Sequence, residues 1–402
     1  MEVGHLNSLK DVDVAGKRVL VRVDFNVPTD KKGEIIDDTR IRESLPTLRY
    51  LLEQGARVIA VSHLGRPKGK PVEEFRMDKV AVRLSHLLGK PVRKVSECIG
   101  PQVTLEIDQM NPGEILVLEN IRFYPGEEAN DPEFSKELAG LADIFVNDAF
   151  GAAHRAHASI SGVAEFLPTF AGFLLAKEVK MLSRVMDIAD SPRMAIMGGA
   201  KVAAKLGLLK NLMKKMDVII LGGGMANTFL GASGYSVGKS LHEEAMFGMA
   251  RELIELARDV QKKILLPIDV VVADRFANDA ERKVVPVNEV PDEWMIVDIG
   301  PETIELYRKT INEARTIFWN GPVGVFEFEN FSVGTDEVAR AVANSQAVSV
   351  VGGGDSLAAI YHLGLQDSIT HISTGGGATL EFLEGKALPG LMCCNYKRKM
   401  VV

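Results

Sequence analysis

The sequence predicts an α/β protein built from two Rossmann-like, three-layer lobes, each with a parallel sheet, joined by a helical hinge. Three observations lead to this prediction. Short apolar, β-branched runs recur along the chain at intervals that leave room for one helix each. Amphipathic stretches such as 39–54 and 242–262 lie between these runs, as crossover helices would. The 402 residues are also more than one continuous core usually accommodates.

The apolar runs give the expected strands in chain order. In the first half they are residues 18–23, 57–61, 115–118 and 144–146. In the second half they are residues 194–197, 218–221, 264–266, 270–272, 316–319 and 347–351. Between the halves, residues 166–187 begin with a proline-containing turn and continue with a helical period, so the domain junction is expected there. We therefore expect a first domain over 1–170, a hinge helix over 171–187 and a second domain over 188–387.

Composition and charge exclude several classes of protein. The net charge is −7, with 47 basic and 54 acidic residues, so no overall positive field attracts nucleic acid or an anionic membrane. Three cysteines, two of them adjacent, make a disulfide framework improbable and fit a reducing compartment. No stretch has the apolar length of a signal peptide or a membrane span. We expect a cytoplasmic protein without nucleic-acid or membrane partners.

Charged and polar side chains follow the strands of the first half. Asp24 and Asn26 follow the first strand. Basic residues lie in the segments after the four strands, at Arg40, His63, Arg66, Arg122 and Arg155. Because the carboxyl ends of parallel strands meet at one edge of a sheet, these side chains are expected to converge. Guanidinium groups bind carboxylate and phosphate oxygens in pairs, so the cluster predicts a ligand that carries both groups.

Each of these residues also has a simpler interpretation. A lone arginine is usually a solvated surface charge, and a lone histidine such as His63 is more often a packing residue than a catalytic base. His154 and His157 flank Arg155 and could pack a loop or bind zinc, but no cysteine or carboxylate stands beside them at ligand spacing, and we expect no metal there. The number of basic residues at strand ends favours a binding site.

Glycine clusters follow the strands of the second half. They are residues 198–199, 222–224, 321–324, 352–354 and 375–377. Such clusters let backbone amides approach phosphates at helix N-termini. The segment 234–240 resembles a Walker A loop but has one residue too few between its glycines, and no GxGxxG follows a strand. A nucleotide site that is neither a P-loop nor a dinucleotide fold is expected.

Charged residues next to these glycines complete the expected nucleotide site. Lys201 and Lys205 are four residues apart, so on a helix they would share a face and could both address a triphosphate. Asp355 ends a GGGD turn and is the best candidate ligand for Mg²⁺, which binds one or two carboxylates together with phosphate oxygens and water. Asp355 could also cap the helix that follows, and the two roles are compatible.

Eight strings occur in order over nearly the whole length: VRVDFNVP, SHLGRPKG, ENIRFYPGEE, FVNDAFGAAHRAHAS, MGGAKV, WNGPVGVFE, VGGGDS and STGGGATLEFLEGK. Together they resemble the phosphoglycerate kinase family. The resemblance implies reversible, Mg²⁺-dependent, in-line transfer between ATP and the carboxylate of 3-phosphoglycerate, giving ADP and 1,3-bisphosphoglycerate in glycolysis. It also implies a monomer that closes about its hinge, with residues 388–402 returning to the first lobe.

The resemblance also assigns site residues. Those implied to hold 3-phosphoglycerate are Asp24, Phe25, Asn26, Arg40, His63, Leu64, Gly65, Arg66, Arg122 and Arg155. Those implied to hold the nucleotide are Lys201, Lys205, Gly223, Asn320, Glu327, Gly353, Gly354, Asp355 and Ser356, with Glu327 on the ribose and Asp355 on Mg²⁺. Ser356 stands where threonine is common in this family, and it keeps the hydroxyl.

The expected chemistry needs alignment and charge neutralisation rather than a base. A carboxylate acceptor has a pKa of about 4 and is already ionised at neutral pH. Candidate catalytic groups are Arg40, Lys201 and the amides around Gly376, with Mg²⁺. A nonenzymatic two-lobed binding protein would leave the lysine pair and the glycine turns without a purpose, and a dehydrogenase would need a dinucleotide fingerprint.

Overall fold

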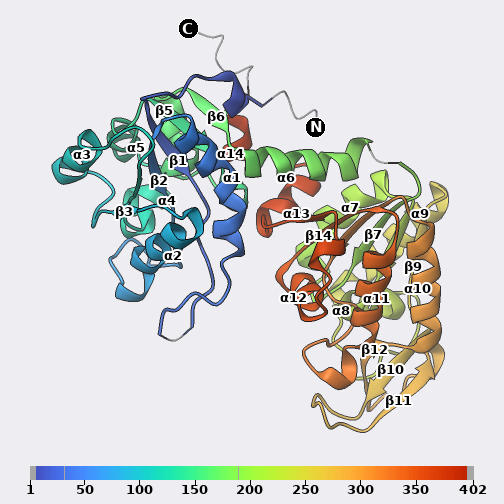
Figure 1. The fold of residues 1–402 in the computed structure, drawn as a ribbon. Coiled ribbons are helices and arrows are strands. Elements are labelled where there is room, and N and C mark those ends of the chain that lie inside the picture. The colour runs from blue at the N-terminus through green and yellow to red at the C-terminus, as the bar shows by residue number, and fades with distance from the viewer. Residues whose placement is uncertain (1–5, 31, 189, 396–402) are drawn as a thin grey trace. The chain divides into compact units, whose positions relative to one another are not determined.

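The computed structural model describes residues 6–30, 32–188 and 190–395, which form two compact units. Unit 1 contains the described residues up to Lys180 and those from Ala387 onward, and unit 2 comprises Met181–Lys386. The division falls inside helix α6 (Phe173–Ser183), which follows strand β6 (Thr169–Ala171) and continues as a π-helical turn at Arg184–Ile188 (Figure 1). The expected hinge helix, 171–187, thus falls on two consecutive helical segments, of which only Phe173–Ser183 is α-helical.

Unit 1 contains a six-stranded sheet in the order β3-β4-β2-β1-β5-β6, and all of its neighbouring strands are parallel. Its other strands are β1 (Arg18–Arg22), β2 (Arg57–Val61), β3 (Arg93–Lys94), β4 (Ile115–Val117) and β5 (Ile144–Asn147). Its helices are α1 (Thr39–Glu53), α2 (Asp78–Leu88), α3 (Pro101–Asp108), α4 (Pro125–Ala129), α5 (Pro132–Ala139) and α14 (Pro389–Met392).

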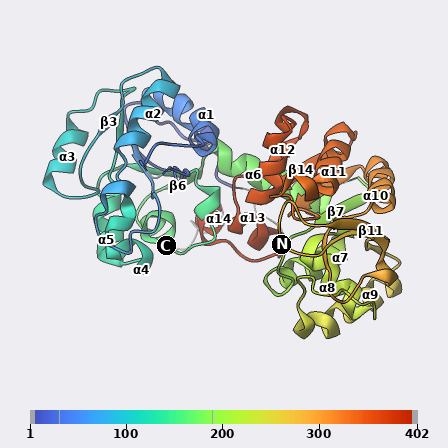
Figure 2. The same ribbon diagram turned by 90° about the horizontal axis from the view of Figure 1, so that it is seen from below.

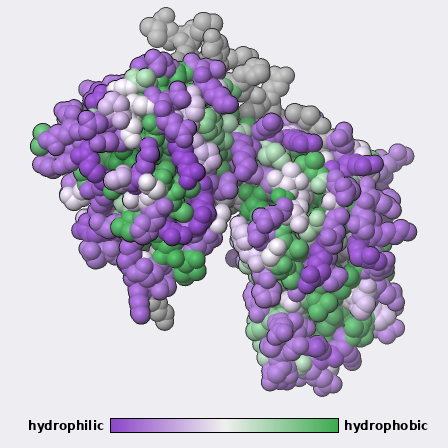
Figure 3. Space-filling model, in the orientation of Figure 1, coloured by the Kyte–Doolittle hydropathy of each residue, from purple (hydrophilic) through white to green (hydrophobic). Residues whose placement is uncertain are grey.

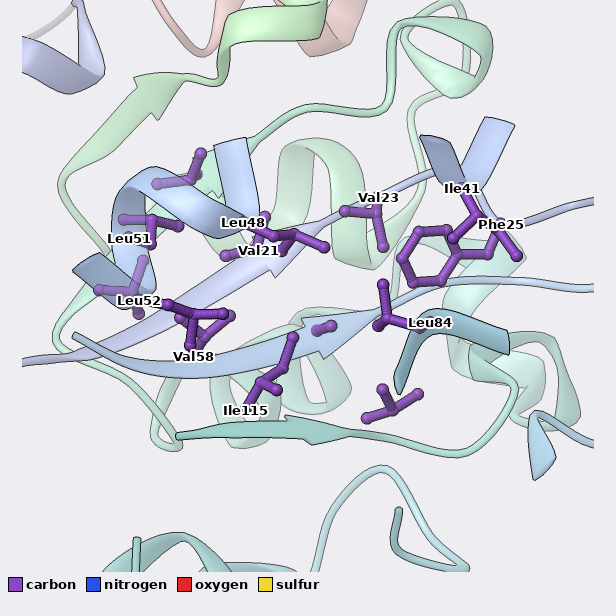
Figure 4. Packing of buried hydrophobic residues seen from close by; sticks show 14 of the residues in the cluster. Val21, Val23, Phe25, Ile41, Leu48, Leu51, Leu52, Val58, Leu84 and Ile115 are labelled. Atoms are coloured by element: carbon purple, nitrogen blue, oxygen red, sulfur yellow. The ribbon is translucent and has the colours of Figure 1, made fainter. Parts of the chain in front are cut away.

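Helices cover both faces of this sheet because its strands are apolar on both sides. In β1, Val19 and Val21 pack in one buried cluster with residues of α1 and α2. Figure 4 shows Val21 of this cluster together with Leu48 of α1 and Leu84 of α2. Leu20, which points to the opposite face, packs with residues of α3 and α5. The result is the three-layer arrangement that the apolar runs predict.

The segment around α14 is part of unit 1 although it follows unit 2 in sequence. The backbone N–H of Gly390 donates to the carbonyl of Ala153 at 2.8 Å, and the Asn147 amide nitrogen donates to the carbonyl of Gly390 at 3.0 Å. The N–H of Asn7 donates to the carbonyl of Cys394 at 2.8 Å. Residues 396–402, the remainder of the expected returning segment, lie outside the described residues.

Unit 2 contains a second parallel six-stranded sheet, in the order β15-β14-β13-β7-β8-β9. Its strands are β7 (Arg193–Met197), β8 (Val218–Leu221), β9 (Lys263–Leu265), β13 (Thr316–Asn320), β14 (Val348–Gly352) and β15 (His371–Ile372). Its helices are α7 (Leu206–Lys215), α8 (Gly223–Ala232), α9 (Phe247–Asp259), α10 (Pro301–Glu313), α11 (Val333–Asn344), α12 (Gly354–His362) and α13 (Gly377–Leu383). Figure 2 shows α10–α12 on one side of this sheet and α7–α9 on the other.

One strand of unit 2 does not belong to the parallel sheet. The run 270–272 was expected to be parallel, but it lies in β10 (Asp269–Ala273), the middle strand of a small antiparallel sheet with β11 (Arg282–Pro286) and β12 (Met295–Ile299). Only three residues separate β9 from β10, too few for the crossover helix that a parallel neighbour requires. The prediction for this strand was therefore wrong.

The visible surface of each unit is largely hydrophilic, with apolar residues scattered in small groups (Figure 3). Over the described residues, no helix combines the length and apolar character needed to span a membrane.

Candidate functional site

Four neighbouring strands of unit 1, in the order β4-β2-β1-β5, end at the same edge of the sheet. The loops after them carry the polar residues that the sequence singled out. The N–H of Phe25 after β1 donates to the Ser62 hydroxyl after β2 at 2.9 Å, and the N–H of Gly65 donates to the Asn26 side-chain oxygen at 2.9 Å. These two hydrogen bonds join the loop after β1 to the loop after β2, so the side chains on the two loops have fixed positions.

Asp24 and Arg40 form the first part of this site. Nη1 of Arg40, in the first turn of α1, donates to Oδ2 of Asp24 at 2.8 Å. The Asp24 side chain is 8% exposed and the Arg40 side chain 32%, so the carboxylate is enclosed while the guanidinium keeps open N–H groups. The carboxylate orients the arginine, and the arginine remains available to an anion.

His63 lies among positive charges. It is buried, and its pKa is held well below its usual value by burial and by the charges of four arginines, Arg22, Arg122, Arg155 and Arg40. Burial, with the charges of Arg155 and Arg22, lowers the pKa of Arg122 to about 10. Positive groups that lower one another's pKa in this way are stabilised when an anion binds between them. His63 is therefore neutral, and the cluster is suited to an anionic ligand.

Several predicted residues contribute to this site through backbone atoms. Phe25 and Leu64 are buried in the core, so only their backbone borders the site. Gly65 has a φ of +64°, and a side chain there would lie 2.5 Å from the Phe75 ring; its carbonyl accepts a hydrogen bond from Nη1 of Arg122 at 2.8 Å. Arg66 is exposed on the surface.

Arg22 was missed by the sequence analysis. It is the last residue of β1, it is 1% exposed, and its Nη2 lies 3.1 Å from Nδ1 of His63. Its Nε donates to the Ser159 hydroxyl at 2.8 Å, and that hydroxyl donates to the Glu127 carboxylate at 2.7 Å. A charged residue within an otherwise apolar, fully buried strand was the available signal, because such a charge needs partners.

Glycine loops at the strand ends of unit 2 pack backbone against backbone. A side chain on Gly198 would lie 1.9 Å from the carbonyl oxygen of Pro322, and one on Gly321 would lie 2.4 Å from the carbonyl oxygen of Gly198. The N–H of Gly223 donates to the carbonyl of Val323 at 2.8 Å. The loops after β7, β8 and β13 thus approach one another in a way that only glycine permits.

The two lysines of the expected nucleotide site lie in different environments. Nζ of Lys205 donates to the carbonyl of Gly198 at 2.8 Å, and burial lowers its pKa to about 8 although Asp355 opposes this. Lys201 is exposed and precedes the short 3₁₀ turn Ala203–Lys205, while α7 begins only at Leu206. The two lysines therefore do not share a helix face, because the glycine turn delays the start of the helix.

The GGGD segment places its residues at the start of α12. Gly353 has a φ of +93° and is the N-cap, so Asp355 stands in the first turn with its carboxylate exposed. Asp355 is not the capping residue. The Ser356 hydroxyl is buried and accepts a hydrogen bond from the N–H of Gly321 at 2.6 Å, which joins α12 to the loop after β13. Gly376, with a φ of +54°, begins α13 in the same manner.

An apolar pocket of about 240 Å³ adjoins these loops. Three of the predicted nucleotide residues line it, Gly223, Glu327 and Asp355. Asn320 does not line it; its amide donates to the carbonyl of Gly352 at 2.9 Å and braces the glycine turn. Other lining residues, absent from the sequence predictions, are Leu241, Pro267, Phe276, Met295, Val297 and Val325. Glycine walls, apolar side chains and two edge carboxylates suit a flat base attached to a sugar.

The described part of the chain contains no group of three or more histidine, cysteine or acidic side chains arranged to bind a metal. Asp355 nevertheless fits Mg²⁺, because its exposed carboxylate lies at the glycine loops, where phosphate oxygens and water could complete the ligand set.

Comparison with known proteins gives consistent matches along the chain. The family model described as phosphoglycerate kinase matches residues 9–386. The phosphoglycerate kinase of Moorella thermoacetica is 57% identical over 390 residues, which is 97% of this chain and 99% of that protein. That of Rubrobacter xylanophilus is 57% identical over 384 residues, covering 96% of this chain and 97% of that protein.

Solved structures agree with these sequence matches. The structure of phosphoglycerate kinase from Coxiella burnetii has a TM-score of 0.90 and 44% identity, covering 98% of this chain and 100% of that one. The enzyme from Pyrococcus horikoshii has a TM-score of 0.83 and 37% identity, covering 97% and 98% of the two chains.

Proposed function

The chain belongs to the phosphoglycerate kinase family, and we propose that it binds phosphoglycerate on the basic cluster of unit 1 and the nucleotide on the glycine loops of unit 2. This family transfers a phosphoryl group between ATP and the carboxylate of 3-phosphoglycerate in glycolysis. The observation that carries the assignment of the acceptor site is the position of His63, a neutral histidine surrounded by four arginines.

The acceptor carries a phosphate and a carboxylate, both of which arginine binds well. Arg122 and Arg155 provide positive charge within the cluster, and Arg40 presents N–H groups beside Asp24. Asp24 and Asn26 provide polar atoms for the hydroxyl group of the acceptor. Arg66 is exposed and would reach the ligand from outside the cluster.

Proton removal is not part of this mechanism. The acceptor carboxylate is ionised at neutral pH, since its pKa is about 4. His63 is neutral and would act as a hydrogen-bond partner for the acceptor. What limits the reaction is repulsion between an anionic acceptor and a highly charged phosphoryl group, and positive groups in a dry site reduce that repulsion.

The nucleotide would extend from the apolar pocket to the glycine loops. We assign the base to the pocket, the ribose to Glu327 and the phosphates to Lys205, Lys201 and the amides of Gly353, Gly354 and Gly376. Lys205, with a pKa of about 8, is still mostly charged at neutral pH. Asp355 would hold Mg²⁺, which when bound supplies positive charge to the phosphate oxygens.

The basic cluster belongs to unit 1 and the glycine loops to unit 2, so in-line transfer requires the two substrates to be brought together and water to be excluded. We propose that closure about the α6 region does this, with residues 1–170 and 188–387 acting as the two functional domains. The acidic net charge of −7 and the three free thiols support the further proposal of a cytoplasmic enzyme without nucleic-acid or membrane partners. A monomer is proposed from the family, and light scattering of the purified chain tests it.

A coupled assay tests the proposal as a whole. The purified chain is incubated with ATP, Mg²⁺ and 3-phosphoglycerate, and formation of 1,3-bisphosphoglycerate is followed through NADH oxidation by an added dehydrogenase. Turnover that requires all three components is expected. Absence of turnover in a folded preparation would overturn the proposal.

A further inference from the structure

A buried chain of hydrogen bonds leads from Glu127 to His63. We propose that Glu127 and Ser159 are positioning residues of the acceptor site, which act through Arg22 to hold His63 as the tautomer with its hydrogen on Nε2. The proposal rests on the proposed function where it concerns the acceptor, because His63 is assigned to that ligand. The position of the hydrogen is a property of the protein alone.

The hydrogen-bond chain consists of four contacts between side chains or backbone groups that are almost completely buried. Glu127 accepts two hydrogen bonds from Ser159, one from the hydroxyl at 2.7 Å and one from the backbone N–H at 2.8 Å. The same hydroxyl accepts from Nε of Arg22 at 2.8 Å, and Nη2 of Arg22 lies 3.1 Å from Nδ1 of His63. The exposed fractions are 0% for Glu127 and Ser159, 1% for Arg22 and 5% for His63.

The direction of each bond follows from the groups involved. Arginine has N–H donors and no acceptor, so Nδ1 of His63 must accept the bond from Arg22. The competing arrangement would place the hydrogen on Nδ1 and direct it to Oδ1 of Asp24, but that distance is 4.0 Å, too long for a hydrogen bond. In the neutral ring the hydrogen is therefore on Nε2, and His63 is a donor at that atom.

Ser159 also fixes the orientation of Arg22. Its hydroxyl has one hydrogen, which it gives to Glu127, so its lone pairs face the guanidinium. A third donor of Arg22, Nη1, is bound to the carbonyl of Val23. With Nε, Nη1 and Nη2 each bound to a different partner, the guanidinium plane cannot turn without breaking a buried hydrogen bond.

The charges of Arg22 and Glu127 support the same chain of hydrogen bonds. Burial lowers the pKa of Arg22, and the charge of Glu127 opposes that fall. Burial would raise the pKa of Glu127, but the bonds from His157 and Ser159 and the charge of Arg22 outweigh it, so the pKa of Glu127 is lowered. Glu127 is thus the ionised partner of Arg22 through Ser159, and without it the buried charge that touches His63 would lose the larger of the two carboxylate interactions that offset its burial, those of Glu127 and Asp24.

Breaking this chain of hydrogen bonds at Glu127 or Ser159 should allow His63 to adopt either tautomer. Arg22 would lose its anchor, the bond to Nδ1 would weaken, and the ring could then carry its hydrogen on Nδ1 and accept at Nε2. An acceptor atom facing an anionic ligand repels it. The loss should therefore appear in the binding of phosphoglycerate and not in that of ATP.

The experiment uses the full chain labelled with ¹⁵N-histidine, and the His63 signals are assigned by their loss in His63→Gln. In the parent protein without substrate we expect a hydrogen-bearing Nε2 and a bare Nδ1. In Ser159→Ala and Glu127→Gln we expect a mixture of tautomers, with KM for 3-phosphoglycerate raised about tenfold and KM for ATP unchanged. The matched controls, Ser161→Ala in the same segment and exposed Glu133→Gln, should behave as the parent.

The outcomes separate this inference from the assigned function. Hydrogen on Nδ1 in the parent, or an unchanged tautomer in both variants, would overturn the inference even if the enzyme is active. An inactive parent would overturn the function and leave the tautomer result standing. If Glu127→Gln does not fold, Ser159→Ala decides alone, because that substitution removes only one hydroxyl group. Equal rises of KM for 3-phosphoglycerate and KM for ATP in Ser159→Ala would indicate a merely structural role and count against the inference.

Discussion

Nη1 of Arg40 lies 2.8 Å from Oδ2 of Asp24, a contact that joins the first turn of α1 to the loop after β1. We expect Arg40→Ala to reduce turnover by about 100-fold or more, because removal of a preorganised charge from such a site costs about 3–4 kcal/mol of transition-state stabilisation. Nucleotide affinity should change little, since Arg40 belongs to unit 1. Initial rates and calorimetry with ATP measure the two quantities.

The control for this variant is Arg42→Ala on the same helix. Arg42 is 54% exposed and pairs with Asp38 one turn away, so its loss should leave turnover nearly unchanged. A large loss of ATP binding in Arg40→Ala, or equal effects of the two substitutions on turnover, would contradict the assignment of Arg40.

Lys205 is directed into the glycine loops by its contact with the carbonyl of Gly198. We expect Lys205→Met to raise KM for ATP at least tenfold while the melting temperature changes by only a few degrees, because burial already disfavours the charge of this lysine and methionine replaces most of its apolar stem. Steady-state kinetics and thermal unfolding provide the comparison. Lys210→Met, an exposed position on α7, is the control; a large fall in stability with an unchanged KM would assign Lys205 a structural role.

Asp355 offers a test of the metal assignment. Asp355→Asn should weaken binding of Mg·ATP by about tenfold or more, and binding of ATP in the presence of a chelator should be affected far less, because the amide keeps the shape but loses the charge that Mg²⁺ prefers. Calorimetry with and without Mg²⁺ distinguishes these effects. Exposed Asp367→Asn is the control. A variant that binds phosphoglycerate poorly and Mg·ATP normally would disprove the assignment.

The parallel sheets and the charged strand tails could be predicted because their signals are local. Apolar β-branched runs at helical spacing give strands such as β1 and β8 to within one or two residues. The convergence of His63, Arg122 and Arg155 follows from parallel strands ending at one edge. These features require only the order of strands and the residues next to them.

Features that depend on packing between distant segments could not be predicted in this way. The small sheet β11-β10-β12 places Met295 and Val297 in the pocket wall, and neither residue carries a motif. Lys201 and Lys205 were expected on one helix face, but the glycine loop delays the helix start to Leu206. Arg22 and Ser159 are 137 residues apart in sequence, so their contact has no local signature.

Asp148 provides a prediction about stability and pH. It is fully buried in unit 1, and burial raises its pKa from 3.8 to about 7, although hydrogen bonds from Thr47, Leu175 and Leu174 oppose the rise. Between these two values the folded chain holds a proton that the unfolded chain has lost, so this group lowers the free energy of unfolding as pH rises from about 4 to about 7. Above that range the buried, ionised carboxylate of Asp148 lowers the free energy of unfolding by about 4 kcal/mol.

Asp148→Asn should remove this dependence, because the amide resembles the protonated acid and can still accept the hydrogen bond from the N–H of Leu174. Relative to the parent, the variant should gain stability as pH rises from about 5 to about 8. Both tryptophans, Trp294 and Trp319, lie in unit 2, so unfolding of unit 1 is best followed by circular dichroism and by exchange of the Leu174 and Leu175 amides.

Asp143 is a control of opposite sign in the same unit. A hydrogen bond from Arg18 lowers the pKa of Asp143, so this carboxylate contributes stability above its ordinary pKa and loses the contribution as pH falls through the lowered value. Asp143→Asn should therefore be less stable than the parent at pH 8, where Asp148→Asn gains. Between pH 5 and 8 the stability difference between Asp143→Asn and the parent should stay constant, because Asp143 is ionised throughout that range. If this difference changes there as much as that of Asp148→Asn, burial of the Asp148 charge is not the source of the pH dependence.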